Sequence, residues 1–193
     1  VYGFFRAQSH HEDIELFEEG VSFYFPRQLM DKGSQPNFSL ADYISPSGDD
    51  YIGLFAVTAG HGIENIIQEC QSKNDDYNEI MVKVLADRLA EAAAEWLHRK
   101  VRTKYWGYSK KEDLDLNDML YEKYIGIRPA PGYPACPDHK EKDKIWKLLQ
   151  VENEIGISLT ESRAMFPAAS VCGWYFSHPK ARYFSVLKNE RLK

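Results

Sequence analysis

The chain lacks the features that mark several common classes of protein. Among its 193 residues there are only three cysteines, and no two of them form a CxxC pair. A sparse, odd set of this kind argues against a disulfide framework and against a structural zinc site, so we expect three reduced thiols. No apolar run approaches the roughly 20 residues that a membrane-spanning helix needs. These absences favour a cytoplasmic protein without a resident metal ion or a membrane partner.

An excess of basic residues is also missing, since 24 Lys and Arg stand against 29 Asp and Glu and give a formal net charge of −5. A negative balance argues against nucleic acid as the partner. Glycine-rich phosphate motifs are absent too, and we interpret residues 59–62 (Ala-Gly-His-Gly) as a strand-to-helix turn. The chain has no GxSxG nucleophile elbow, and Cys136 lies among prolines without an adjacent base, so no catalytic nucleophile is assigned.

The first residues carry neither an initiator methionine nor a signal peptide, and they have the composition of a strand. We therefore expect the chain to be a fragment of a longer protein. Apolar residues make up 44% of it, which is enough to bury a core, and its length suits one domain over residues 1–193.

Aromatic and β-branched residues predict strands in the first and last thirds of the chain. These expected strands cover residues 2–5, 14–17, 21–25, 51–58, 158–162, 170–177 and 182–186. Between them we expect a long helix over 75–105 and shorter helices over 117–124 and 139–155, the last ending at Gly156 in a left-handed cap. This order predicts an α+β fold, with a twisted antiparallel sheet flanked by one long helix and several shorter ones.

The long helix has apolar residues at intervals of three and four, which predicts one buried stripe. The expected stripe consists of Tyr77, Ile80, Met81, Val84, Leu85, Leu89, Ala92, Ala93, Trp96, Leu97 and Val101. Asp87, Glu91 and Glu95 follow one another at intervals of four and share a different face. That acidic row is either a solvated face or a docking face for a partner.

The most unusual segment covers residues 128–137 and reads Arg-Pro-Ala-Pro-Gly-Tyr-Pro-Ala-Cys-Pro. Its four prolines fix the backbone and push each preceding residue into an extended conformation. Arg128 offers a planar fork for a carboxylate, and Ala130 leaves its backbone N–H and C=O open to a purine edge. Tyr133 offers an aromatic face to a cation such as a sulfonium. From these residues alone the segment is either a site for a zwitterionic, adenine-bearing ligand or a rigid connector with a structural arginine.

The chain resembles the C-terminal reactivation domain of cobalamin-dependent methionine synthase. The resemblance is carried mainly by the Pro-rich segment and its flanks, residues 127–139. Further matching blocks occur at residues 75–77, 80–83, 85–92, 159–162 and 170–179. In that family the domain binds S-adenosylmethionine and docks on the domain that carries cobalamin. Inactive cob(II)alamin is then reduced by one electron from flavodoxin or a flavoprotein reductase, and methyl transfer from S-adenosylmethionine restores methylcobalamin.

The resemblance also implies roles for individual residues. Arg128 would hold the methionine carboxylate, the Ala130 backbone would meet the adenine, and Tyr133 would lie near the sulfonium or the corrin. Tyr183 and Phe184 would complete the ligand contacts. The family uses an acidic residue upstream of Val1 to hold the ligand's amino group, and this chain has no counterpart, so we expect weaker binding than in the intact domain.

For the acidic row, the resemblance favours a docking face. When the cobalamin domain arrives, its cobalt-ligating histidine is released and must stay protonated. A pair of carboxylates favours the charged imidazole, and we assign this role to Asp87 and Glu91.

Of two other functions, one is compatible with the residues and the second lacks its expected motif. The chain could be an interaction-only module, whose Pro-rich segment docks the cobalamin domain or the reductase without binding a ligand. A free-standing small-molecule methyltransferase would normally show a Rossmann-like glycine-rich turn, and none is present. Residues 10–13 (His-His-Glu-Asp) could bind a metal ion adventitiously, but clustered polar residues between strands are usually a turn. Glu161 and Ser162 fall in an expected strand and could hydrogen-bond either a ligand or a neighbouring loop.

Overall fold

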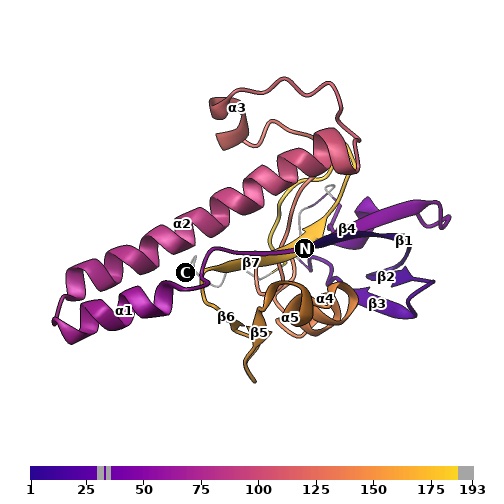
Figure 1. Cartoon of the computed structure of the whole chain (residues 1–193). Coiled ribbons are helices and arrows are strands. Elements are labelled where there is room, and N and C mark those ends of the chain that lie inside the picture. Colours follow the sequence, from indigo (N-terminus) through magenta and orange to yellow (C-terminus); the bar gives the residue numbers. More distant parts are fainter. Residues whose placement is uncertain (30–32, 34–35, 187–193) are drawn as a thin grey trace.

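The computed structural model describes residues 1–29, 33 and 36–186 and shows an α+β domain (Figure 1). Five antiparallel strands form the main sheet in the order β3-β2-β1-β4-β7. Their bounds are β1 Tyr2–His10, β2 Asp13–Leu16, β3 Val21–Tyr24, β4 Asp50–Thr58 and β7 Ser170–Tyr175. The predicted fold class is confirmed.

Strand β4 is the centre of the domain because both of its faces are covered. Successive side chains of a strand point to opposite faces. Leu54 and Ala56 accordingly belong to one buried cluster, whereas Phe55 belongs to another. The paired strand β7 repeats the alternation, with Trp174 on the first side and Tyr175 on the second. The sheet is therefore the middle layer of three.

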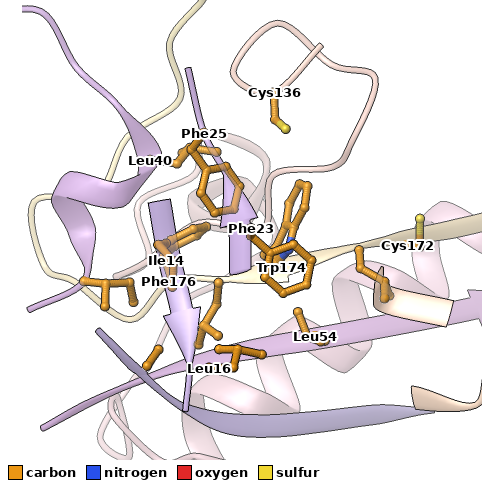
Figure 2. Packing of buried hydrophobic residues seen from close by; sticks show 14 of the residues in the cluster. Ile14, Leu16, Phe23, Phe25, Leu40, Leu54, Cys136, Cys172, Trp174 and Phe176 are labelled. Atoms are coloured by element: carbon orange, nitrogen blue, oxygen red, sulfur yellow. The ribbon is translucent and has the colours of Figure 1, made fainter. Parts of the chain in front are cut away.

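The larger core lies on the side of Trp174, which is fully buried (Figure 2). Phe23 and Phe25 meet its indole edge-on, with ring centroids 5.7 and 4.9 Å away. Phe176 in turn packs edge-on against Phe25 at 5.8 Å. Helices α4 (Glu141–Leu149) and α5 (Val151–Ile155) cover this side, and Ile145 of α4 is completely buried.

A helical hairpin covers the opposite side and extends beyond the sheet (Figure 1). It consists of α1 (Ile63–Ser72), whose extent the sequence patterns did not predict, and α2 (Asp76–Lys100). The Asp75 side chain caps α2 by accepting a hydrogen bond from the Asn78 N–H. A π-helical turn, η2 (Val101–Tyr105), prolongs α2 to the end that the periodicity predicts.

The predicted buried stripe of this helix is wrong over most of its length. The side that packs inward carries Ala86, Ala90, Ala94, Leu97 and His98. Small residues let the helix approach the sheet closely, and its C-terminal half meets Phe55 and Tyr175 there. The larger apolar residues point elsewhere, and each of the following is more than a third exposed: Tyr77, Ile80, Met81, Val84, Leu85, Leu89 and Trp96.

Three further expectations need correction. The predicted helix over 139–155 is broken into α4 and α5 at Gln150, which has a positive φ of 48°. Gly156 does cap α5 in the left-handed conformation, as predicted. The expected strand over 158–162 shrinks to β5 (Ser158–Leu159), which pairs with β6 (Met165–Phe166). Residues 182–186 form no strand, because their backbone groups bond to loops instead of a sheet edge.

The remaining elements are short. A 3-10 turn, η1, covers Leu40–Tyr43. Helix α3 covers Leu116–Leu120, so it begins one residue before the predicted helix over 117–124 and ends four residues earlier. Of the helices in the described ranges, none is both long and apolar enough to cross a membrane.

Candidate functional site

A cavity of about 750 Å³ lies where the Pro-rich segment, the C-terminal segment and β7 meet. Its volume falls within the range of small-molecule sites. All five residues that the sequence predicts to bind a ligand line it: Arg128, Ala130, Tyr133, Tyr183 and Phe184. The structure thus brings together two segments that lie about 50 residues apart in the sequence.

The Pro-rich segment is fixed to the end of β7 by backbone hydrogen bonds. Ile127 and Phe176 exchange both of their N–H···O=C bonds at 3.0 Å, and the Trp174 N–H donates to the Pro129 carbonyl at 3.0 Å. The close approach depends on Gly173, because a Cβ there would overlap the Pro129 carbonyl oxygen. The segment therefore continues the sheet by a few residues before it turns away.

A tight turn then presents Tyr133 at the mouth of the cavity. The Gly132 N–H donates to the Cys136 carbonyl at 2.8 Å, and the Cys136 N–H donates to the Tyr133 carbonyl at 2.9 Å. Gly132 has a φ of 92°, and the imidazole of His139 occupies the space that its Cβ would fill. This turn leaves Tyr133 61% exposed, with its ring free to meet a ligand or a partner.

Arg128 places a confined positive charge in the cavity wall. Its side chain is only 20% exposed, and its nearest anions are Glu95 at 3.5 Å from Nε and Glu91 at 3.6 Å from Nη2. At these distances the two contacts are ion pairs that lack hydrogen-bond geometry. The buried Nε has no hydrogen-bond partner in the described part of the chain. Burial opposes the charge, but Tyr183, Glu95 and Glu91 together raise the pKa of the guanidinium. Arg128 is therefore a permanent cation with unused donors.

The C-terminal segment closes the other side of the cavity. The Tyr183 hydroxyl accepts a hydrogen bond from the Arg128 backbone N–H at 3.0 Å. The Val186 N–H donates to the Pro134 carbonyl at 2.9 Å. Phe184 packs against the larger core and holds this segment in place.

Comparison with known proteins identifies the kind of domain. Residues 1–191 match the family model of the vitamin B12 dependent methionine synthase activation domain. The chain belongs to this family. A solved structure of the MetH reactivation domain bound to AdoHcy is 49% identical and superposes with a TM-score of 0.91 over 96% of this chain. The chain spans 60% of the length of that structure.

In this activation domain the three acidic residues of the row on α2 are buried to different extents. Asp87 is exposed and makes no ion pair with any described residue. Glu91, one helical turn further, lines the cavity beside Arg128. Glu95 lies deeper, between Arg128 and the buried Arg102. Only one member of the predicted docking pair therefore reaches the cavity wall.

Below Arg128 the activation domain contains a buried polar layer. Arg102 is fully buried, and Glu112 accepts hydrogen bonds from its Nε and Nη2 at 2.7 and 2.9 Å. The Tyr124 ring lies 4.0 Å from the Arg102 guanidinium carbon, which adds a cation–π contact. This arrangement holds one arginine rigidly beneath the site.

His98 is the neutral member of the same layer. Its ring is fully buried and stacks on Tyr175, with ring centroids 5.2 Å apart. Burial, together with the positive charges of Arg102 and Arg128, lowers its pKa well below the ordinary value of 6.5. The imidazole therefore adds no third positive charge near neutral pH.

Several cavity residues of the activation domain escaped the sequence interpretation. They are His139, Lys142, Met165, Ser170, Val171 and Cys172. Lys142 is only 6% exposed, and its ammonium donates to the Arg163 carbonyl at 3.0 Å. His139 and Lys142 lie three residues apart at the start of a predicted helix, so their shared face was the available signal. The residues of β7 carried no such signal.

The other sequence candidates lie outside the cavity. Residues 59–62 form the predicted strand-to-helix turn before α1, with Gly62 at a φ of 82°. Residues 10–13 link β1 to β2, and Glu161 and Ser162 lie in the exposed turn between β5 and β6. Among the described residues no three His, Cys, Asp or Glu side chains are placed to share a metal ion.

All three cysteines are free thiols, as expected, and all three are buried. Burial raises the pKa of Cys136 and of Cys172 to about 12. Both thiols therefore stay protonated near neutral pH, and a protonated thiol is a poor nucleophile.

Proposed function

We propose that this cavity binds S-adenosylmethionine and its product AdoHcy, and that the domain presents the methyl group to cobalamin carried by another domain. One observation carries the proposal above the others. Arg128 is a largely buried cation with unused donors, and it faces a cavity of suitable volume. Its ion pairs with Glu95 and Glu91 compensate the charge but leave hydrogen-bond donors of the guanidinium unused, and the carboxylate of a ligand can accept from them. The methionine carboxylate is that acceptor.

The remaining contacts fit the rest of the same ligand. The backbone N–H of Ala130 makes no hydrogen bond with the described residues, so it is available to a ring nitrogen of adenine. The exposed ring of Tyr133 offers a π face to the sulfonium. Tyr183 and Phe184 form the wall opposite the Pro-rich segment. We assign ligand contact to these five residues on that basis.

Presentation of the methyl group requires position more than acid–base chemistry. Cobalamin on its own domain would accept the methyl group after a one-electron reduction of its cob(II) form, with flavodoxin or a flavoprotein reductase as the proposed cytoplasmic donor. The role of this chain is to hold the ligand so that its methyl carbon faces the partner. Because the Pro-rich segment is short and rigid, it loses little conformational entropy when it holds the ligand.

We propose a docking role for Asp87 and Glu91, because Glu91 lines the cavity and the exposed Asp87 lies one helical turn before it on α2. A partner that reaches the ligand must also pass this exposed part of α2. We propose that the two carboxylates stabilise the protonated form of the histidine that leaves cobalt. In the intact enzyme, changing Asp87→Asn together with Glu91→Gln should lower the pH at which histidine release is half complete, as followed by the cobalamin spectrum. An unchanged pH dependence would count against this role.

The binding proposal is tested by calorimetry of the 193-residue chain with AdoHcy. Arg128→Met keeps the volume but removes the cation, and we expect about 30-fold weaker binding, which corresponds to roughly 2 kcal/mol for a hydrogen-bonded charged pair. Arg6→Met is the matched control, because Arg6 pairs with Asp49 on the surface away from the cavity. Its affinity should match that of the wild type.

The same measurement distinguishes the competing function. An interaction-only module would show neither heat nor a thermal shift with millimolar AdoHcy. The exposed apolar side of α2 is the observation that favours this alternative, since large exposed apolar areas often mark interaction surfaces. Binding that depends on Arg128 would exclude it.

A further inference from the structure

We propose that Glu95 is a positioning residue for Arg128, fixing the guanidinium so that its free edge meets the ligand carboxylate. The inference rests on the proposed ligand function and adds a residue to it. Glu95 does not line the cavity, so its influence on the ligand is exerted through Arg128.

Glu95 is held between two arginines. Its Oε2 lies 3.5 Å from Nε of Arg128, and its Oε1 lies 3.7 Å from Nη1 of Arg102. The side chain of Arg102 is fixed in position, because it is fully buried and donates two hydrogen bonds to Glu112. Glu95 therefore transmits the fixed position of Arg102 to the wall of the cavity.

The partners of Arg128 leave part of its guanidinium available. Glu95 is nearest to Nε and Glu91 to Nη2, and these two nitrogens share one edge of the planar group. Neither glutamate makes its closest contact with Nη1. Two parallel bonds from the Nη1 and Nη2 side suit a carboxylate. Glu95 thus occupies the edge that the ligand does not need.

Glu91 is unsuited to the same role. Its side chain is 47% exposed, against 29% for Glu95, so water screens its charge more strongly. It also lines the cavity, where an arriving carboxylate would compete with it for Nη2. Glu91 is a ligand-side neighbour, whereas Glu95 supports Arg128 from behind.

The charges of the layer require an anion at this position. Arg128 and Arg102 both approach Glu95, so a neutral side chain would leave two cations facing each other across it. Like charges in a partly buried layer repel more strongly than in water. The neutral His98 adds nothing to offset them. Without Glu95, the guanidinium of Arg128 would move toward Glu91 and the solvent.

The test compares two ligands that differ only in the carboxylate. Calorimetry of the Glu95→Gln chain should show about tenfold weaker binding of AdoHcy, equal to roughly 1.4 kcal/mol. Decarboxylated AdoHcy should bind the variant and the wild type within about twofold, since it does not use Arg128. Glu79→Gln is the matched control: it also removes an ion pair from α2, with Lys83, but it lies outside the cavity.

A second variant covers the case in which Glu95→Gln does not fold. Glu95→Asp keeps the charge but shortens its reach, and it should weaken AdoHcy binding by about threefold without affecting the decarboxylated ligand. An equal loss for both ligands would show a purely structural role and overturn the inference, as would no loss for either. If wild-type protein binds neither ligand, the proposed function itself fails.

Discussion

Replacement of Arg102 by methionine is expected to lower the free energy of unfolding by about 3–5 kcal/mol. The reason is that Glu112 would lose its ion-pair partner. Glu112 is 3% exposed and receives both of its charge-assisted hydrogen bonds from Arg102. Without them its carboxylate is a buried, uncompensated charge, and the side chain cannot reach water without opening the loop around residues 106–115. Urea denaturation followed by tryptophan fluorescence measures the loss.

A double variant separates the buried charge from lost packing. Adding Glu112→Gln to Arg102→Met removes the unpaired carboxylate, so it should recover about half of the lost stability. If the double variant is as unstable as the sum of the two single changes, the ion pair contributes nothing special and packing explains the effect.

Gly173→Ala is expected to reduce both stability and ligand affinity. The new methyl group would overlap the Pro129 carbonyl oxygen and lie 3.1 Å from the Phe55 ring. The Pro-rich segment must then move off β7 and lose the hydrogen bond from Trp174. Overpacking of this kind costs about 3 kcal/mol. Because Arg128 and Ala130 flank Pro129, we also expect AdoHcy affinity to fall by more than about 30-fold, the effect expected for losing Arg128 alone.

Gly20→Ala provides the control for this prediction. Gly20 has a φ of 61°, so alanine is strained there, but no atom lies within 4 Å of the added Cβ. The variant should lose about 1 kcal/mol of stability and keep its ligand affinity. Ligand affinity retained in Gly173→Ala would mean that the segment tolerates displacement from β7, contrary to the rigidity argued above.

The sequence predicts the elements well where local signals suffice. The three-and-four periodicity predicts a helix over 75–105, and α2 together with η2 covers Asp76 to Tyr105. It does not define which face is buried, because apolar residues such as Leu89 and Trp96 satisfy the period whether or not anything covers them. The alanines pack inward instead, because only small side chains fit between the helix and the sheet when the two lie close together.

The chemistry of the residues predicted only one wall of the candidate site, and Tyr183 and Phe184 on the opposite wall were expected from the family resemblance alone. Arg128, Ala130 and Tyr133 are close in sequence, so a rigid segment places them together without any knowledge of the fold. Lys142 and Cys172 face them through long-range packing, which no local pattern encodes. The same limit explains the missing strand over 182–186. That segment has the composition of a strand, but its hydrogen-bond partners are side chains and loops.

The breadth of the cavity wall has a consequence for how the domain folds. Its lining runs from Glu91 to Ser185, so nearly half the chain must be arranged before the site exists. Contacts so distant in sequence carry a large loop-closure cost and form late in folding. On the proposed function the ligand binds only the completed fold, so by mass action it should stabilise the sheet, the helical layer and the C-terminal segment together. The free energy of global unfolding should therefore rise as the ligand occupies more of the cavity.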